Sequence, residues 1–163
     1  MILNSDNFSS PLPEMNVSPP DKLFEQTEES GLNEKKVERK PFVLVFGSDE
    51  DSRFLFKTIL EIWDYDTAEA VTVEQAIRVA EFNRPDIVLM DTEFLFPESF
   101  AEMRKMRKCE LFKNVPFILI SGHAQEDVRL MALAVGAADF FVKPVNLDHL
   151  EIILKTSLSD LGQ

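Results

Sequence analysis

Cysteine is almost absent from this chain, and its scarcity excludes several classes of protein. Cys109 is the one cysteine in 163 residues, so neither an intramolecular disulfide nor a zinc site built from several cysteines can form. The N-terminus, MILNSDNF, has no basic flank and no long apolar core. No run of about 18 apolar residues occurs anywhere in the chain. We therefore expect a cytoplasmic protein without a membrane segment.

Positive charge is scarce as well. The chain has 17 Lys and Arg against 29 Asp and Glu, which gives a formal net charge of −12. Phosphate backbones and anionic lipid surfaces repel a chain this acidic. We therefore expect protein partners, and neither nucleic acid nor membrane.

The chain divides by composition into a leader and one domain. Residues 1–40 are rich in Ser, Asn, Pro and Glu, with prolines that interrupt any periodic pattern. Such a segment buries too little apolar surface to offset the entropy lost on ordering. We predict a disordered leader over residues 1–40 and one globular domain over residues 41–160.

From residue 41 onward short apolar runs alternate with longer amphipathic segments, which is typical of a parallel sheet covered by helices. The second run looks half-exposed, as expected of an edge strand, whereas the others look buried. The pattern predicts an α/β fold of doubly wound (βα)5 type. The predicted strands cover residues 42–46, 66–70, 86–90, 116–120 and 140–142.

Capping signals predict the helices between these strands. Ser48 or Asp49 can cap the first helix, and Thr72 with Gln75 has the spacing of a capping box for the second. Gly136 is suited to end the fourth helix. The predicted third, fourth and fifth helices cover about 99–108, 125–135 and 147–158. We expect the first helix to turn these apolar residues inward: Phe54, Leu55, Ile59, Ile62 and Trp63.

Three polar residues follow predicted strands: Asp91 the third, Ser121 the fourth and Lys143 the fifth. Carboxyl ends of parallel strands meet at one edge of a sheet, so these side chains should converge. A carboxylate there can act as a nucleophile toward phosphorus, Lys143 can supply positive charge and Ser121 a hydroxyl hydrogen bond. Singly, each residue is more often a cap, a turn former or a solvated side chain. Their joint placement carries the prediction of phosphoryl chemistry.

The segments PDIVLMD, FILISG and GAADFFVKP make the chain resemble the receiver domain of bacterial two-component response regulators, over about residues 42–158. The resemblance implies a flavodoxin-like five-stranded sheet of order 2-1-3-4-5. It also implies that Asp91 is the phosphoacceptor, that Lys143 senses the phosphate and that Ser121 is the switch hydroxyl. Phe140 matches an aromatic position that changes rotamer on activation, although plain core packing explains it as well.

The chain departs from the pattern of receiver domains at the acidic pair expected after the first strand, and also after Asp91, where Leu95 stands at a position that is commonly proline. Aligned without a gap, VLVFGSDEDSR has Gly47 and Ser48 at the two acidic positions. The metal ligands implied by the resemblance are then Asp91 and the backbone carbonyl of Glu93, with Asp49 as an alternative ligand. We therefore expect Mg²⁺, which prefers a near-octahedral set of oxygen ligands, to bind weakly.

Two functions follow from this pattern. The first is a single-domain response regulator, not an enzyme, that accepts a phosphoryl group on Asp91 from a histidine kinase or phosphotransfer protein. It would signal through an unidentified downstream protein, as a monomer or weak homodimer. The second is a pseudo-receiver that binds a partner constitutively and never carries phosphate. An oxidoreductase, which the flavodoxin-like fold could also suggest, is disfavoured because neither a glycine-rich phosphate loop nor a GxGxxG motif follows the first predicted strand.

Overall fold

The computed structural model describes residues 38–92, 98–123 and 125–162. The chain divides after Glu38, and the unit Arg39–Gln163 carries the helices and strands. No helix in the described segments is both long and apolar enough to cross a membrane. The predicted leader falls almost wholly outside these segments and stays a prediction. The elements are β1 (Phe42–Phe46), α1 (Glu50–Ile62), β2 (Asp66–Ala70), α2 (Val73–Phe82), β3 (Ile87–Thr92), α3 (Glu98–Arg107), the 3₁₀ helix η1 (Glu110–Phe112), β4 (Phe117–Ser121), α4 (Glu126–Ala134), β5 (Asp139–Val142) and α5 (Leu147–Leu161).

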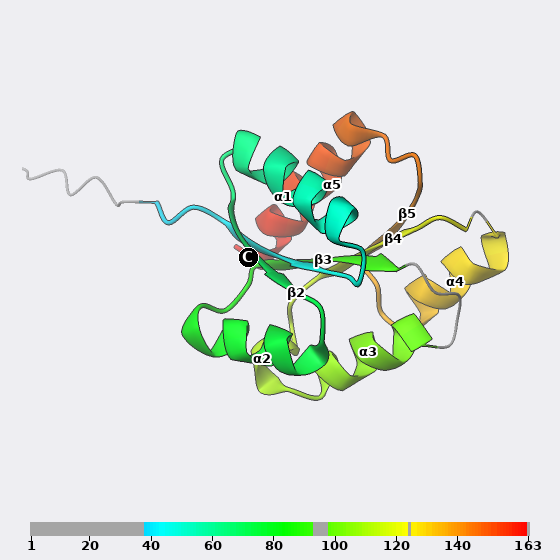
Figure 1. The fold of residues 1–163 in the computed structure, drawn as a ribbon, viewed down its shortest axis with the longest axis horizontal. Coiled ribbons are helices and arrows are strands. Elements are labelled where there is room, and N and C mark those ends of the chain that lie inside the picture. Colours follow the sequence, from blue (N-terminus) through cyan, green and yellow to red (C-terminus); the bar gives the residue numbers. More distant parts are fainter. Residues whose placement is uncertain (1–37, 93–97, 124, 163) are drawn as a thin grey trace, which may run out of the picture. The chain divides into compact units, whose positions relative to one another are not determined.

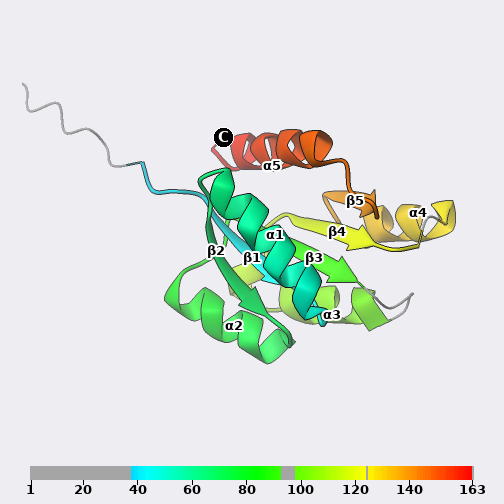
Figure 2. The ribbon, with the colours of Figure 1, turned by 45° about the horizontal axis from the view of Figure 1, so that its top comes forward.

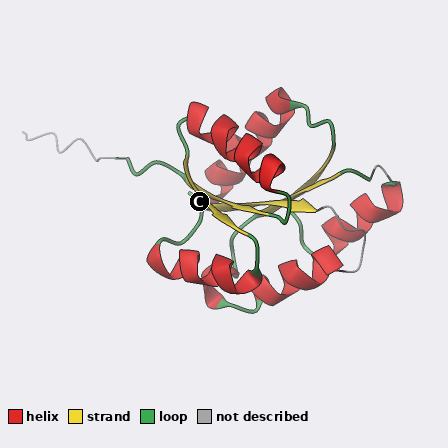
Figure 3. Ribbon diagram, viewed as in Figure 1, coloured by secondary structure: helices red, strands yellow, loops and turns green. Residues whose placement is uncertain are grey.

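The five strands form one parallel sheet of order β2-β1-β3-β4-β5, which confirms the predicted flavodoxin-like topology. Helices α1 and α5 cover one face, and α2, α3 and α4 cover the other, as Figure 1 shows and Figure 3 repeats by element type. The order of strands reverses beside β1, between β1 and β3. In such sheets this reversal opens a crevice at the carboxyl edge.

Alternation along the strands builds a separate core on each face of the sheet. Successive strand side chains point to opposite faces, so Leu44 and Phe46 pack under α2 and α3, whereas Val43 and Val45 pack under α1 and α5. β2 is the exposed edge, as its half-apolar sequence predicts. The central strands β1, β3 and β4 are buried along their whole length.

The capping predictions are confirmed, with one refinement. Asp49, and not Ser48, caps α1, because its carboxylate accepts a hydrogen bond from Ser52 N. Thr72 accepts from Gln75 N at the start of α2. Gly136 follows α4 with a φ of 99°, a conformation that favours glycine.

The prediction for the inward face of α1 is wrong for three of its five residues, whereas Ile59 and Trp63 are half-buried and Trp63 packs against the core. Phe54, Leu55 and Ile62 are 72%, 54% and 76% exposed, whereas Phe56 and Leu60 are buried against the sheet. Apolar residues occupy more than half of the circumference of α1, and one stripe alone can face the core. The buried stripe also contains Arg53, which the apolar pattern does not predict.

Candidate functional site

The candidate site lies at the carboxyl edge of the sheet, beside the point where the strand order reverses. Strand β3 continues past its predicted end, so Asp91 lies within the strand, opposite Ile120 of β4. Its neighbour Thr92 is opposite Ser121. Figure 2 shows the arrowheads of β3 and β4 pointing to this same edge. The predicted convergence of strand ends therefore occurs here.

Asp91 and Lys143 form a close ion pair at this edge. Lys143 Nζ lies 2.9 Å from each of the two carboxylate oxygens of Asp91. The Asp91 side chain is 1% exposed and that of Lys143 is 33% exposed. Nζ donates a hydrogen bond to Oδ2 and contacts Oδ1 as an ion pair, and Oδ1 has no hydrogen-bond partner among the described residues. A buried anion is thus charge-compensated while one of its oxygens keeps open lone pairs.

A serine that the sequence pattern did not indicate completes the surroundings of Lys143. Lys143 Nζ also donates to Ser52 Oγ, at 3.2 Å, from the first turn of α1. Ser52 N in turn donates to Asp49 Oδ2 at 2.9 Å. The hydrogen bonds with Ser52 hold the pKa of the Asp49 carboxyl below its ordinary value, and the charges of Lys143 and Arg53 act in the same direction. The one signal for Ser52 is its place in the first turn after β1, because that turn begins at the carboxyl edge.

Ser121 belongs to the same edge through its backbone and its hydroxyl. Its carbonyl accepts a hydrogen bond from Lys143 N at 2.8 Å, so the backbone joins β4 to the start of the β5–α5 loop. Its Oγ accepts from His123 N at 3.1 Å, and the side chain is buried. Because a hydroxyl can accept and donate together, this bond leaves the Ser121 hydrogen available to a further acceptor.

The backbone after β1 packs tightly against Asp91. A Cβ atom built on Gly47 would lie 3.0 Å from the Asp91 carbonyl oxygen and 3.2 Å from Asp91 Cβ. Buried Arg53 holds this turn by donating from Nη1 to the carbonyls of Gly47 and Ser48, each at 2.8 Å. Glycine at position 47 therefore permits a close approach of β1 to β3 that a side chain would disturb.

Of the two other predicted site residues, Phe140 lies in the core and Glu93 is not among the described residues. Phe140 of β5 is 6% exposed and lies in the core between the sheet and α2, α3 and α4. It pairs with Leu119 of β4 in the sheet.

A divalent cation finds few ligands among these residues. Within the described segments no group of three or more His, Cys, Asp or Glu is placed to hold a metal ion. Asp91 offers the open Oδ1, but Gly47 and Ser48 carry no carboxylate, and Asp49 already caps α1. Since Mg²⁺ is usually held by more than one oxygen ligand, the described residues do not fit it.

The domain that carries this buried acid, strand-end lysine and strand-end hydroxyl is similar to known proteins. The family model described as the response regulator receiver domain matches residues 43–155. The chain belongs to this family. Receiver domains are signalling modules of two-component systems, generally not catalytic enzymes; they interact with histidine kinases and typically bind Mg²⁺. The predicted resemblance to receiver domains is thereby confirmed.

Individual relatives agree with this membership. The chain is 28% identical over 120 residues to the phosphate regulon transcriptional regulatory protein PhoB of Pseudomonas aeruginosa. The aligned region covers 74% of this chain and 52% of PhoB. The chain is also 30% identical over 122 residues to the transcriptional regulatory protein PrrA of Mycobacterium tuberculosis, covering 75% of this chain and 52% of PrrA. The chain thus spans about half the length of these curated relatives.

Solved structures share the fold. The chemotaxis response regulator CheY4 of Vibrio cholerae superposes with a TM-score of 0.63 at 22% identity, covering 74% of this chain and 100% of CheY4. The Francisella response regulator 1452 receiver domain gives a TM-score of 0.65 at 24% identity, covering 75% of this chain and 99% of that chain.

Proposed function

We propose that this receiver accepts a phosphoryl group on Asp91 from a histidine kinase or phosphotransfer protein and signals through contacts with another protein. The observation that carries the proposal is the state of the Asp91 carboxylate. It is buried and paired with Lys143, yet Oδ1 has no hydrogen-bond partner among the described residues. An acid held in this way keeps a nucleophilic oxygen in a site of reduced dielectric, where nearby charges act strongly.

The chemistry of transfer is simple in atoms and electrons. An oxygen of Asp91 bonds to phosphorus while the phosphorus–nitrogen bond of a donor phosphohistidine breaks. The electron pair leaves with the imidazole, which takes up a proton from solvent. Lys143 Nζ offsets negative charge on the phosphoryl oxygens, and the free hydrogen of Ser121 Oγ supplies a hydrogen bond to one of them. Phe140, packed beside Leu119, would respond by changing rotamer.

The proposal includes a degenerate metal site, with Gly47 and Ser48 in place of an acidic pair. The 3.0 Å approach of a Gly47 Cβ to the Asp91 carbonyl supports it, because a side chain at position 47 would press on the Asp91 backbone. We therefore expect weak Mg²⁺ binding, with Asp91 and the Glu93 carbonyl as the ligands and Asp49 as a less favourable one.

The direct test is phosphorylation by a small donor. The protein is incubated with acetyl phosphate and Mg²⁺ and its intact mass is measured. We expect an adduct of one phosphoryl group that Asp91→Asn abolishes. Absence of the adduct under conditions that modify an ordinary receiver would refute phosphotransfer as the mechanism.

A second candidate, the constitutive pseudo-receiver, is favoured by one observation. Gly47 and Ser48 supply no carboxylate, and no other group of acids among the described residues replaces them. Ser48→Asp separates the candidates, because it adds a carboxylate without the crowding at Gly47. A weakened but working metal site predicts that Mg²⁺ raises the melting temperature of this variant more than that of the parent. No response of either protein to millimolar Mg²⁺ would favour the pseudo-receiver.

A further inference from the structure

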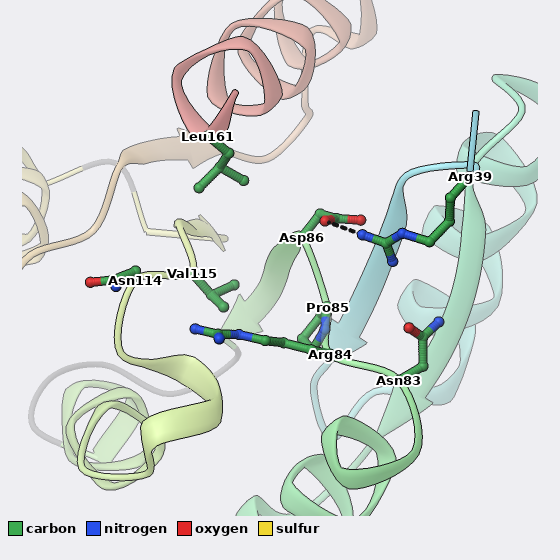
Figure 4. Close-up of a pocket in the computed structure, with 8 residues that line it drawn as sticks. All are labelled: Arg39, Asn83, Arg84, Pro85, Asp86, Asn114, Val115 and Leu161. Carbon is green, nitrogen blue, oxygen red and sulfur yellow. Dashed lines mark hydrogen bonds and ion pairs between the residues drawn. The ribbon is translucent and has the colours of Figure 1, made fainter. Parts of the chain in front are cut away.

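A pocket lies at the opposite edge of the sheet, away from Asp91. It is bordered by the ends of α2 and α5, by the start of β3 and by the loop before β4, with a volume of about 420 Å³. Ligand pockets for small molecules commonly have about 300–1,000 Å³, so its size suits a compact organic molecule. Figure 4 shows the residues around it: Arg39, Asn83, Arg84, Pro85, Asp86, Asn114, Val115 and Leu161.

The pocket combines an apolar base with a polar rim. Pro85 and Val115 are buried at its base, and Leu161 contributes an exposed apolar side chain from the end of α5. Asn83, Arg84 and Asn114 are exposed and come from the two loops that border it. An apolar body with a polar group at one end would therefore match both parts.

The charges and donors of the rim favour an anion. Arg39 is already paired with Asp86, at 2.8 Å, the one interaction drawn among these residues in Figure 4. In the described segments the side chains of Asn83, Arg84 and Asn114 have no hydrogen-bond or ion-pair partner. Arg84 is thus an uncompensated cation, and Figure 4 shows its side chain running toward Val115 and Asn114, whose amide can donate a hydrogen bond, while Asn83 lies on the other side of the pocket.

We propose that this pocket binds a small organic anion, an apolar ring or short chain that carries one carboxylate or phosphate monoester. The anionic group binds Arg84 with help from Asn114, and the apolar body packs on Pro85, Val115 and Leu161. The competing explanation is structural. The carboxyl ends of α2 and α5 carry partial negative charge at this edge, and Arg84 would merely offset it.

The test is a titration of the ¹⁵N-labelled full chain followed by the amide signals of Arg84, Asp86 and Asn114. Phenyl phosphate and benzoate represent the two anionic groups, and phenol and inorganic phosphate represent the two halves of the ligand. We expect saturable shifts at these three amides with either complete probe, and binding at least about tenfold weaker with either half.

Variants separate ligand binding from a structural role. Arg84→Ala should weaken binding by about tenfold or more, because it removes a charged hydrogen bond. Asn114→Asp, which keeps the shape but adds a negative charge, should weaken it as well. Arg78→Ala is the matched control, since Arg78 is an exposed arginine on α2 outside the pocket. A correctly folded spectrum of each variant shows that loss of binding is not loss of fold.

Several outcomes would overturn the proposal. They are shifts centred on Asp91 and Lys143 instead, equal affinity for phenol and phenyl phosphate, and unchanged binding in Arg84→Ala. Loss of stability in Arg84→Ala with no saturable shift in the parent would assign Arg84 to the helix ends alone. None of these outcomes bears on phosphorylation of Asp91, which the intact-mass measurement tests separately.

Discussion

Strand β3 has an aspartate near each end, and the two are held in different ways. Asp86, just before the strand, has a donor on each oxygen: Arg39 Nη2 at 2.8 Å on Oδ1 and Phe42 N at 2.7 Å on Oδ2. Asp91, near the other end, is paired with Lys143 but has an Oδ1 without a hydrogen bond among the described residues. The Asp86 side chain is 20% exposed and that of Asp91 is 1% exposed.

The difference teaches how one residue type serves two purposes. A carboxylate whose oxygens are both satisfied ties two strands together and has little tendency to react. A buried carboxylate with one open oxygen is costly to keep, and such groups are typical of reactive or ligand-binding sites. This contrast agrees with a structural role for Asp86 and with the chemical role that we propose for Asp91.

The largest expected effect is the loss of folding stability when the cation paired with each aspartate is removed. Lys143→Met should lower the free energy of unfolding by about 2–3 kcal/mol, because it leaves a buried carboxylate without its cation. Arg39→Met should cost less than about 1 kcal/mol, since the Arg39 side chain is 58% exposed and its pair with Asp86 is screened by water. Urea denaturation of both variants gives the comparison.

A double variant controls for other effects of the methionine. Lys143→Met with Asp91→Asn should recover most of the loss, because no charge is then left uncompensated. Equal destabilisation by the two single methionine variants would mean that burial does not distinguish the two ion pairs.

Substitution of the aspartates themselves should give a smaller contrast in the opposite direction, with the larger loss of stability at Asp86. Asp86→Asn replaces one acceptor oxygen by a donor and so loses a hydrogen bond, at a cost of about 1 kcal/mol. Asp91→Asn removes a buried charge while Lys143 keeps Ser52 as a partner, so its cost should be less than half as large. Thermal melts at pH 7 measure both. A larger loss in Asp91→Asn would assign a structural role to Asp91 too.

Ser52 offers a finer test of the carboxyl edge. Ser52→Ala removes one of the two partners that Lys143 Nζ has in the described part of the chain. We expect phosphorylation by acetyl phosphate to slow by about two- to fivefold, because the ammonium is then less firmly positioned. Thr58→Ala is the matched control, because Thr58 Oγ1 donates to Phe54 O on an exposed part of the same helix. Similar phosphorylation rates for the two variants would mean that Ser52 does not help to position Lys143.

The smallest effect is the acid dependence of Asp49. Its folded pKa lies below the ordinary value of 3.8, so its charge contributes stability that is present above that pH and is lost as the pH falls through the folded pKa. Asp49→Asn keeps a capping oxygen but removes the charge. Melts of parent and variant should therefore differ slightly near neutral pH and coincide in strong acid. A difference that persists in acid would point to lost cap geometry instead.

The topology was predictable because its signal is local. Buried strands appear as continuous apolar runs and capped helices fill the gaps, so the strand limits differ from the predicted ones by at most two residues. Asp91 and Lys143 were predictable for the same reason, since each follows or ends an apolar run.

The inward face of α1 and the role of Ser52 depend on packing between distant segments. On α1, Arg53 enters the buried stripe because the carbonyls of Gly47 and Ser48 accept its hydrogen bonds. Leu55 and Ile62 are thereby left on the exposed side. Ser52 meets Lys143 across 91 positions of the chain, a contact that no local period can indicate.

The central claim is that Asp91, and not Asp86, is the reactive carboxylate of this receiver. Borohydride reduces an aspartyl phosphate to homoserine, so the protein is treated with acetyl phosphate and Mg²⁺, reduced, digested and analysed by tandem mass spectrometry. The account predicts homoserine at position 91 and unmodified aspartate at position 86. Homoserine at position 86, or at both positions equally, would contradict it.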